Sequence, residues 1–517
     1  MSVDSTVPGP KDEGGDSLKV LRGAGLSAVG GALQAALRMV SSLLITRSLG
    51  AEAFGIFVLA NRVTLMGTLF SDAGQSDAAM HFVALHRGER APGKALGAFR
   101  LTLGISLMLS LVMAIAVYVS APIVANRVFH NPELVPIIRL LALAVPPSVV
   151  VPVCVSALRG TRNVRDAVLI RSLVVPGARV VLFAAFLLLG MRLFGLVWAF
   201  ILSLVAGMLY GLWRLRRSAR WMASDVVAEY QVKRVLMFSL PLVLFSVLGY
   251  VYSSSDVLIV GYYRPEKAVG IYGLATRVVG MLSMPVGALS ALFVPLCAEL
   301  YGAGQMDRLR RMFQATTSWG LRATIPVCLA TVLFAGPLMS VFGPEFTEGA
   351  TCLKVMSSMA VTSTFSVLAG YAVYMSGRSW VVTCNAAAQA AMSVVLSLAL
   401  VPRYGIEGAA VARAVGMAVL GALTVFEASY FLGIRPLHAN MLKSLLAAGV
   451  SFAICRMLLE IDVLDGSRLA AVSLAILFFA LYLGQVWLLG LTEDEHYVLE
   501  RLRARFRGAG KQPGTPA

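Results

Sequence analysis

Residues 55–63, GIFVLANRV, recur in closely similar form as residues 270–278, GIYGLATRV. The two stretches are identical at six positions, and each carries an arginine, Arg62 or Arg277, within an apolar run. Because arginine is a rare and costly residue at membrane depth, its presence at the same place in both stretches carries more weight than the apolar matches. Many membrane transporters are built from internal repeats. The pair therefore predicts a chain made of two copies of one unit.

The composition indicates an integral membrane protein. Of 517 residues, 58% are hydrophobic and 14% are charged, and the mean hydropathy is +0.79. This leaves too little polar surface to coat a water-soluble globule of this length. The formal net charge is +17, but the basic residues gather in short loops between apolar runs, which favours a role in membrane topology over nucleic-acid binding. We expect the lipid bilayer as a partner and no nucleic acid.

Long apolar segments predict an all-α fold. A helix needs about 20 apolar residues to cross the hydrocarbon core, and about fourteen segments of the chain meet this requirement. They are residues 25–46, 53–75, 96–120, 134–157, 166–189, 193–214, 236–260, 268–295, 319–342, 352–375, 380–401, 407–432, 441–459 and 469–490. With the repeat, they predict two pseudo-symmetric six-helix lobes followed by a C-terminal helical hairpin.

Loop charges predict the orientation and the domain boundaries. If the N-terminus is cytoplasmic, most loop lysines and arginines lie on the cytoplasmic side, so we expect both ends of the chain there. The long basic loop 214–234 lies between the sixth and seventh segments and separates the lobes. The expected parts are a polar tail (1–22), an N-terminal lobe (23–220), a C-terminal lobe (221–434), an additional transmembrane hairpin (435–492) and a basic tail (493–517).

Three arginines are expected deep in the membrane at one level. Arg38, Arg62 and Arg277 lie eight or nine residues from the outer ends of their predicted helices, which is roughly 13 Å at about 1.5 Å per residue. Each costs about 2.5 to 3.5 kcal/mol at that depth, so a hydrated cavity best explains all three. Guanidinium groups in such a cavity are suited to bind an anion, above all a phosphate.

Two further residues leave alternatives open. Asp256 is the deepest acidic residue and is a candidate for coupling-ion binding or for a structural ion pair with the arginines. Arg179 either joins the cavity or braces the N-terminal lobe. The small number of deep carboxylates argues against a cation or drug antiporter.

No motif supports an enzyme. The sequence has no GxxxxGK[ST] phosphate loop and no GxSxG motif, and its six cysteines and five histidines form no cluster with metal-ligand spacing. We therefore expect no catalytic residues, no metal and no cofactor.

Several motifs resemble those of the polysaccharide (Wzx-type) flippase branch of the multidrug/oligosaccharidyl-lipid/polysaccharide exporter superfamily. They are the first hairpin at residues 42–63, SLLITRSLGAEAFGIFVLANRV, the turn SGR at 376–378, and PRYGIEGAAVARAVG at 402–416. The resemblance covers about residues 24–435. It implies two six-helix bundles around a central cavity, alternating access, and cavity arginines on the first, second and eighth helices that hold a pyrophosphate, where Arg38, Arg62 and Arg277 stand here.

The resemblance also implies a cargo and a location. The expected cargo is an undecaprenyl-pyrophosphate-linked oligosaccharide repeat, moved from the cytoplasmic to the periplasmic leaflet of a bacterial inner membrane for O-antigen, exopolysaccharide or capsule synthesis. A polysaccharide polymerase or export machinery is an expected partner. The final hairpin is similar to that of lipid II flippases, so a lipid II or teichoic-acid precursor flippase is one alternative. A non-transporting membrane scaffold of a glycan synthesis complex is another.

Overall fold

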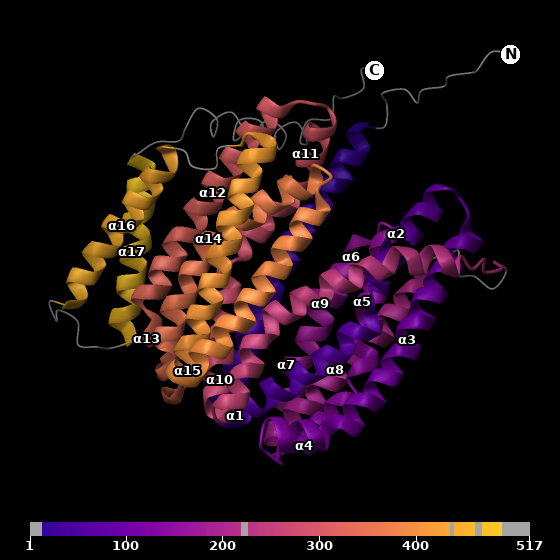
Figure 1. Ribbon diagram of the computed structural model, residues 1–517, viewed down its shortest axis with the longest axis horizontal. Coiled ribbons are helices and arrows are strands. Elements are labelled where there is room, and N and C mark those ends of the chain that lie inside the picture. Colours follow the sequence, from indigo (N-terminus) through magenta and orange to yellow (C-terminus); the bar gives the residue numbers. More distant parts are fainter. Residues whose placement is uncertain (1–12, 219–225, 435–438, 461–467, 489–517) are drawn as a thin grey trace, which may run out of the picture. The chain divides into compact units, whose positions relative to one another are not determined.

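The computed structural model describes residues 13–218, 226–434, 439–460 and 468–488, and these residues form helices and connecting loops (Figure 1). In this part of the chain, eight helices are long and apolar enough to cross a membrane, or nine when one bent pair is counted as a single span. The contacts divide the chain into two units, residues 1–270 and 271–517. We describe each unit by itself.

The first unit packs around one long helix, α1. Its helices are α1 (Glu13–Asp72), α2 (Gln75–Gly88), α3 (Pro92–Ile123), η1 (Val124–Val128), α4 (Leu134–Ala142), α5 (Val145–Gly160), α6 (Val164–Leu169), η2 (Ile170–Val174), α7 (Val175–Leu188), α8 (Arg192–Ser218) and α9 (Val232–Tyr263). Helix α1 contacts α3, α4, α5, α7, α8 and α9. Fully buried Cys154 and Leu158 of α5, with Ile170 of η2 and Leu215 of α8, form part of one hydrophobic core.

Two glycines mark kinks that separate neighbouring predicted segments. Gly50 interrupts α1 with φ 77° and ψ 178°, and Gly405 interrupts α15 (Ser379–Leu432) with φ 59° and ψ −136°. Residues with a Cβ rarely adopt positive φ, whereas glycine does so at little cost. Helix α1 therefore contains the predicted segments 25–46 and 53–75 on either side of a kink, and α15 contains 380–401 and 407–432.

Two predicted segments of the first unit are interrupted. The segment 134–157 is the bent pair α4 and α5, whose axes differ by 40°. Pro146 and Pro147 open α5, where a missing backbone N–H costs nothing. The segment 166–189 contains the π-helix η2 between α6 and α7. Pro176 cannot donate to the carbonyl four residues earlier, so a wider turn directly before it relieves that position.

The second unit consists of further packed helices. Helix α10 (Glu266–Leu282) crosses the boundary between the units, and the helices that follow are α11 (Met284–Gly302), α12 (Met306–Leu333), α13 (Ala335–Ser340), the 3₁₀ helix η4 (Pro344–Gly349), α14 (Ala350–Met375), α15, α16 (Ala439–Glu460) and α17 (Arg468–Leu488). Helix α14 packs against α12 and α15. The hairpin α16–α17 packs on α12, and the Tyr482 hydroxyl donates a hydrogen bond to the Arg322 carbonyl at 2.9 Å.

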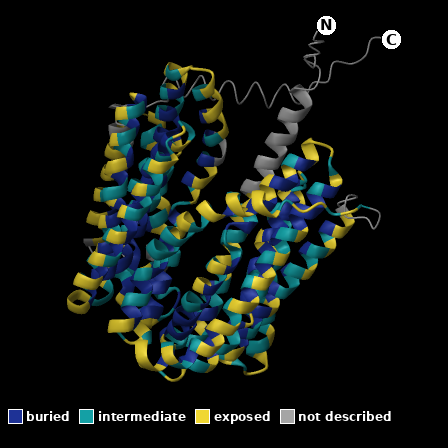
Figure 2. Ribbon diagram, turned by 45° about the vertical axis from the view of Figure 1, so that its right-hand side comes forward, coloured by how far each residue is buried: buried dark blue, intermediate teal, exposed yellow. Residues whose placement is uncertain are grey.

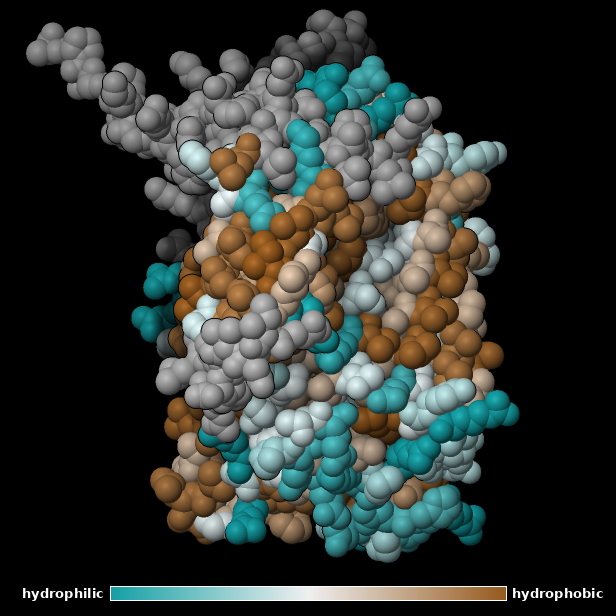
Figure 3. Space-filling model, turned by 90° about the vertical axis from the view of Figure 1, so that its left-hand side faces the viewer, coloured by the Kyte–Doolittle hydropathy of each residue, from teal (hydrophilic) through white to brown (hydrophobic). Residues whose placement is uncertain are grey.

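The helices turn many large apolar side chains outward. Leu188, Phe426, Met457 and Trp487 are among those more than 60% exposed. Buried positions follow the helix contacts within each unit, while exposed positions line the outer faces (Figure 2). Hydrophobic side chains gather on one face in the space-filling view (Figure 3). Patches of this extent are unusual on soluble monomers and are suited to a lipid environment.

The contacts of α9 bear on the organisation of the repeat. The sequence places this helix at the start of the C-terminal lobe (221–434), while its contacts with α1, α2 and α3 group it with the first unit. The lobe boundary at residues 220 and 221 rests on the basic loop 214–234 and stays a prediction. Residues 1–12 of the expected polar tail and the whole of the expected basic tail 493–517 lie outside the described residues.

Candidate functional site

Arg62 is held by two residues of α9. Its side chain is half-buried, and its Nη1 donates a hydrogen bond to the Ser254 hydroxyl at 3.2 Å. The Tyr250 hydroxyl donates to the Arg62 main-chain carbonyl at 2.8 Å. Because Tyr250 and Ser254 are four residues apart, they lie on the same face of α9. The Ser254 hydrogen bond orients the Arg62 guanidinium, and the Tyr250 hydrogen bond holds the backbone of Arg62.

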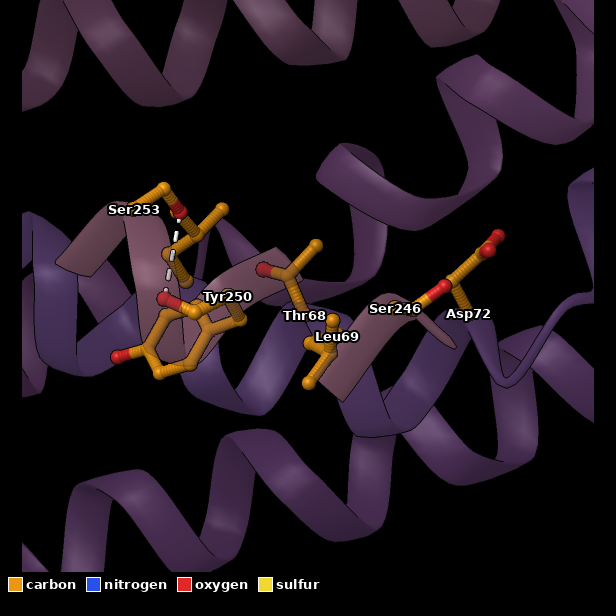
Figure 4. A pocket seen from close by; sticks show the side chains of 7 residues that line it. Thr68, Leu69, Asp72, Ser246, Tyr250 and Ser253 are labelled. Carbon is orange, nitrogen blue, oxygen red and sulfur yellow. Dashed lines mark hydrogen bonds between the residues drawn. The ribbon is translucent and has the colours of Figure 1, made fainter. Parts of the chain in front are cut away.

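A small pocket lies along α1 beyond Arg62. Leu65, Leu69 and Asp72 follow Arg62 at helical spacing, so they share its face of α1. They line a pocket of about 250 Å³, whose other lining residues are Thr68, Ser246, Tyr250 and Ser253 (Figure 4). Pockets for drug-sized ligands usually measure about 300 to 1,000 Å³. This pocket is thus smaller than a typical site for a whole drug-sized ligand.

The hydroxyl groups of the pocket were missed by the sequence analysis. Residues 250–256, YVYSSSD, supply a run of hydroxyls within the apolar helix α9, and this composition was a usable signal. From α1, the Thr68 hydroxyl shares a hydrogen bond with Ser148 of α5 at 3.0 Å, and Asp72 accepts one from Ser76. Two of these hydroxyls also bond to their own helices, since Thr68 donates to the Thr64 carbonyl at 3.2 Å and Ser253 donates to the Tyr250 carbonyl at 3.2 Å.

Arg179 contacts the neighbouring helix α8. Its Nε donates to the Ser203 hydroxyl at 3.4 Å, and its guanidinium lies 4.3 Å from the centroid of the Phe200 ring. The Phe200 ring meets that of Phe57 on α1 edge-on at 5.8 Å. These contacts favour the bracing interpretation of Arg179, because they join α7, α8 and α1.

The other predicted residues lie in separate places. Arg38 is exposed on the first half of α1. Arg277 is half-buried on α10 and belongs to the second unit, so the common level of Arg38, Arg62 and Arg277 stays a prediction. Asp256 is fully buried on α9, and its Oδ1 accepts a hydrogen bond from the Val257 N–H at 2.8 Å. Its expected role as a coupling residue or ion-pair partner also stays a prediction. Within the described residues, no three His, Cys, Asp or Glu side chains lie together as metal ligands.

Comparison with known proteins identifies the family. Residues 20–301, more than half of the chain, match the polysaccharide biosynthesis protein family. The chain belongs to this family. Residues 241–402 also match the MatE family.

This polysaccharide biosynthesis protein has curated relatives among the archaea. The probable low-salt glycan biosynthesis flippase Agl15 of Haloferax volcanii is 25% identical over 260 residues, which are 49% of this chain and 55% of the relative. The probable flippase AglR of the same organism is 24% identical over 185 residues, 34% of this chain and 37% of the relative. The chain thus spans about half or less of the length of the curated relatives it matches.

Solved structures share the fold. The lipid II flippase MurJ in an inward closed conformation has a TM-score of 0.72 at 12% identity, covering 89% of this chain and 97% of that one. An inward-facing multidrug resistance MATE family transporter of the MOP superfamily has a TM-score of 0.67 at 18% identity, covering 77% and 94%. These likenesses confirm the predicted all-α fold of the exporter superfamily, and the chain is that of a multi-pass membrane protein.

Proposed function

We propose that this protein is a flippase for a lipid-linked oligosaccharide. The observation that carries the proposal is the half-buried Arg62, held by Ser254 and Tyr250 within helices long and apolar enough to span a membrane. Family membership and the relatives Agl15 and AglR, both probable flippases, support it.

The proposed cargo matches the chemistry of the site. A sugar and phosphate head group cannot cross hydrocarbon unaided, because its polar groups would lose their hydrogen bonds to water. A guanidinium grips a phosphate at two oxygens, and the hydroxyls of the pocket can replace water around the sugar. Arg62 would hold the diphosphate, with Arg38 and Arg277 as the other expected phosphate ligands, while the lipid tail stays in the bilayer.

The proposed cycle is alternating access. The head group binds from the cytoplasmic leaflet, and a change in the relative position of the two lobes exposes it to the periplasmic leaflet. We infer an undecaprenyl-pyrophosphate carrier and a bacterial inner membrane. We also infer that both ends of the chain are cytoplasmic, because most loop lysines and arginines then lie on the cytoplasmic side. The flipped units would then pass to a polysaccharide polymerase or to export machinery.

A liposome assay tests the proposal. The purified full chain is reconstituted with a fluorescent undecaprenyl-pyrophosphate-linked oligosaccharide, and a membrane-impermeant quencher reports the transfer between leaflets. We expect transfer by the native protein and a loss of about tenfold or more for Arg62→Ala, because a hydrogen bond to a charged group contributes about 1.5 to 3 kcal/mol. Arg62→Lys should retain part of the activity.

The matched control is Arg165→Ala. Arg165 is exposed at the start of the predicted fifth helix, outside the pocket, so this variant should transfer cargo at the native rate. No transfer by the native protein, with the fold intact, would overturn the proposed activity and favour a scaffold. Native transfer by Arg62→Ala would overturn the assigned role of Arg62.

A further inference from the structure

A second cluster of arginines lies in the first unit, away from the pocket beside Arg62. It consists of Arg38 on α1, Arg159 in the last turn of α5, and Arg171 in the π-helix η2, all with exposed side chains. Helix α1 packs directly against α5, α6 and η2. A Cβ added at Gly30 of α1 would lie 2.3 Å from a side-chain carbon of Val168, so α1 approaches the segment that carries Arg171 very closely.

The π-helix η2 sets the direction of Arg171. Its neighbours in sequence, Ile170 and Ser172, are only 0% and 5% exposed, while Arg171 itself points outward. A π-helical turn holds one more residue than an α-helical turn and so changes the directions of the side chains around it. Single π-turns inside α-helices often occur at functional sites.

The three arginines form one electrostatic group. The charge of Arg171 acts unfavourably on both Arg38 and Arg159. Within the part of the chain that the structure describes, no hydrogen bond or ion pair joins these three side chains to a carboxylate. Guanidinium groups held close together attract anions and can bind a phosphate at several oxygens, so the cluster favours a bound anion.

The predicted topology orders the cluster along the membrane normal. Arg159 follows the inner end of segment 134–157, Arg171 lies in the first turns of segment 166–189, and Arg38 lies deeper in segment 25–46. We propose that Arg159, Arg171 and Arg38 form an entry site that receives the diphosphate of the cargo at the inner membrane surface and delivers it to the depth of Arg38. This inference rests on the proposed flippase function and adds Arg159 and Arg171 to its binding residues.

The ligand chemistry has two possible sources. A diphosphate monoester or diester on a polyprenyl chain offers several oxygens to the guanidinium groups. An ordinary anionic phospholipid offers one phosphate diester and is abundant in the same leaflet. Three neighbouring guanidiniums match the larger charge of the diphosphate, so it should bind more tightly than the phospholipid.

Binding of farnesyl diphosphate and of phosphatidylglycerol to the purified full chain tests the entry site. Native mass spectrometry titrates each probe against the native protein, Arg159→Gln, Arg171→Gln, the double variant, Arg171→Lys and the control Arg165→Gln. We expect the double variant to raise the Kd for farnesyl diphosphate about a hundredfold or more, because it loses two charged hydrogen bonds to the phosphates. Arg171→Lys should lie between the native protein and Arg171→Gln, and Arg165→Gln should change the Kd less than about twofold.

The liposome assay supplies the second measurement. The double variant should raise the KM for the lipid-linked oligosaccharide about tenfold, while its elution from a sizing column and its thermal unfolding stay native. An unchanged Kd and KM in the double variant, with native transport intact, would overturn the entry site and leave the flippase function standing. A loss of phosphatidylglycerol binding alone would overturn it as well, by assigning the cluster to phospholipid. No transport by the native protein would overturn both proposals.

Discussion

Replacing Gly55 with alanine probes the contact between the two glycines that the repeat relates. A Cβ at Gly55 would lie 1.9 Å from the Glu266 carbonyl oxygen, and a Cβ at Gly270 would lie 2.0 Å from that of Ala51. The two glycines also face each other, since a Cβ at Gly55 would lie 3.0 Å from the Gly270 nitrogen. No side chain can rotate away from these contacts, because the atoms that would be struck belong to the backbone.

The cost follows from the required displacement. Real Cβ contacts almost never fall below 3.0 Å, so α1, which carries Gly55, and α10, which carries Gly270, must separate locally by about 1 Å or more. Inserting a group into a packed contact typically costs about 1 to 3 kcal/mol. Replacing a helical glycine with alanine also stabilises the helix by about 1 kcal/mol through the higher helix propensity of alanine. The reference is therefore an alanine substitution at a helical glycine whose added Cβ contacts nothing.

Thermal unfolding of the purified protein measures the effect. Gly104→Ala in α3 is the matched control, because no atom lies within 4 Å of the added Cβ. We expect Gly55→Ala and Gly270→Ala to lower the unfolding temperature below that of the native protein, and Gly104→Ala to keep or raise it. Equal unfolding temperatures for Gly55→Ala and Gly104→Ala would refute the close backbone approach.

Three further predictions concern single interactions. Ser254→Ala removes the hydroxyl that accepts a hydrogen bond from Arg62. Because such a bond contributes about 1 kcal/mol, the KM for transport should rise about fivefold. An unchanged KM would contradict the role of Ser254 in positioning the Arg62 guanidinium. Asp166→Ala removes the buried carboxylate that accepts a hydrogen bond from the Arg214 Nε at 2.8 Å. This variant should lose about 3 kcal/mol of stability in thermal unfolding. A variant as stable as the native protein would contradict the importance of this ion pair. Tyr482→Phe removes the hydrogen bond between α17 and α12 and should destabilise the protein by about 1 kcal/mol without changing transport, whereas lost transport would give the hairpin a direct role.

Much of the fold could be predicted because the length of an apolar segment is written directly in the sequence. The predicted segments fall on helices, from α1 to α17. The interruptions were harder to locate, because they depend on backbone geometry that composition does not encode. Gly50 and Gly405 adopt positive φ at kinks between two helical segments, and η2 widens one turn. Other glycines in the same helices remain helical, so glycine alone does not mark a kink.

The candidate site could be predicted only in part. A charged residue such as Arg62 stands out in an apolar run, which is why sequence analysis found it. Hydroxyl residues do not stand out, because they commonly bond to their own helix, as Thr64 does through its bond to the Ala60 carbonyl at 2.9 Å. Which hydroxyls line a pocket depends on how α1 and α9 pack, and only the structure shows that Tyr250 and Ser254 face Arg62.

If this protein moves lipid-linked oligosaccharides between leaflets, its loss should change how these lipids are distributed between the two faces of the membrane in cells. The measurement compares a strain that lacks this protein with its parent, using intact cells and inverted membrane vesicles and a sugar-specific probe that cannot cross the bilayer. We expect undecaprenyl-linked repeats to accumulate on the cytoplasmic face of the membrane and surface polysaccharide to be lost. The native gene should restore the normal distribution and the surface polysaccharide, whereas the gene for Arg62→Ala should not. An unchanged distribution in a strain without a second flippase would contradict the flippase function.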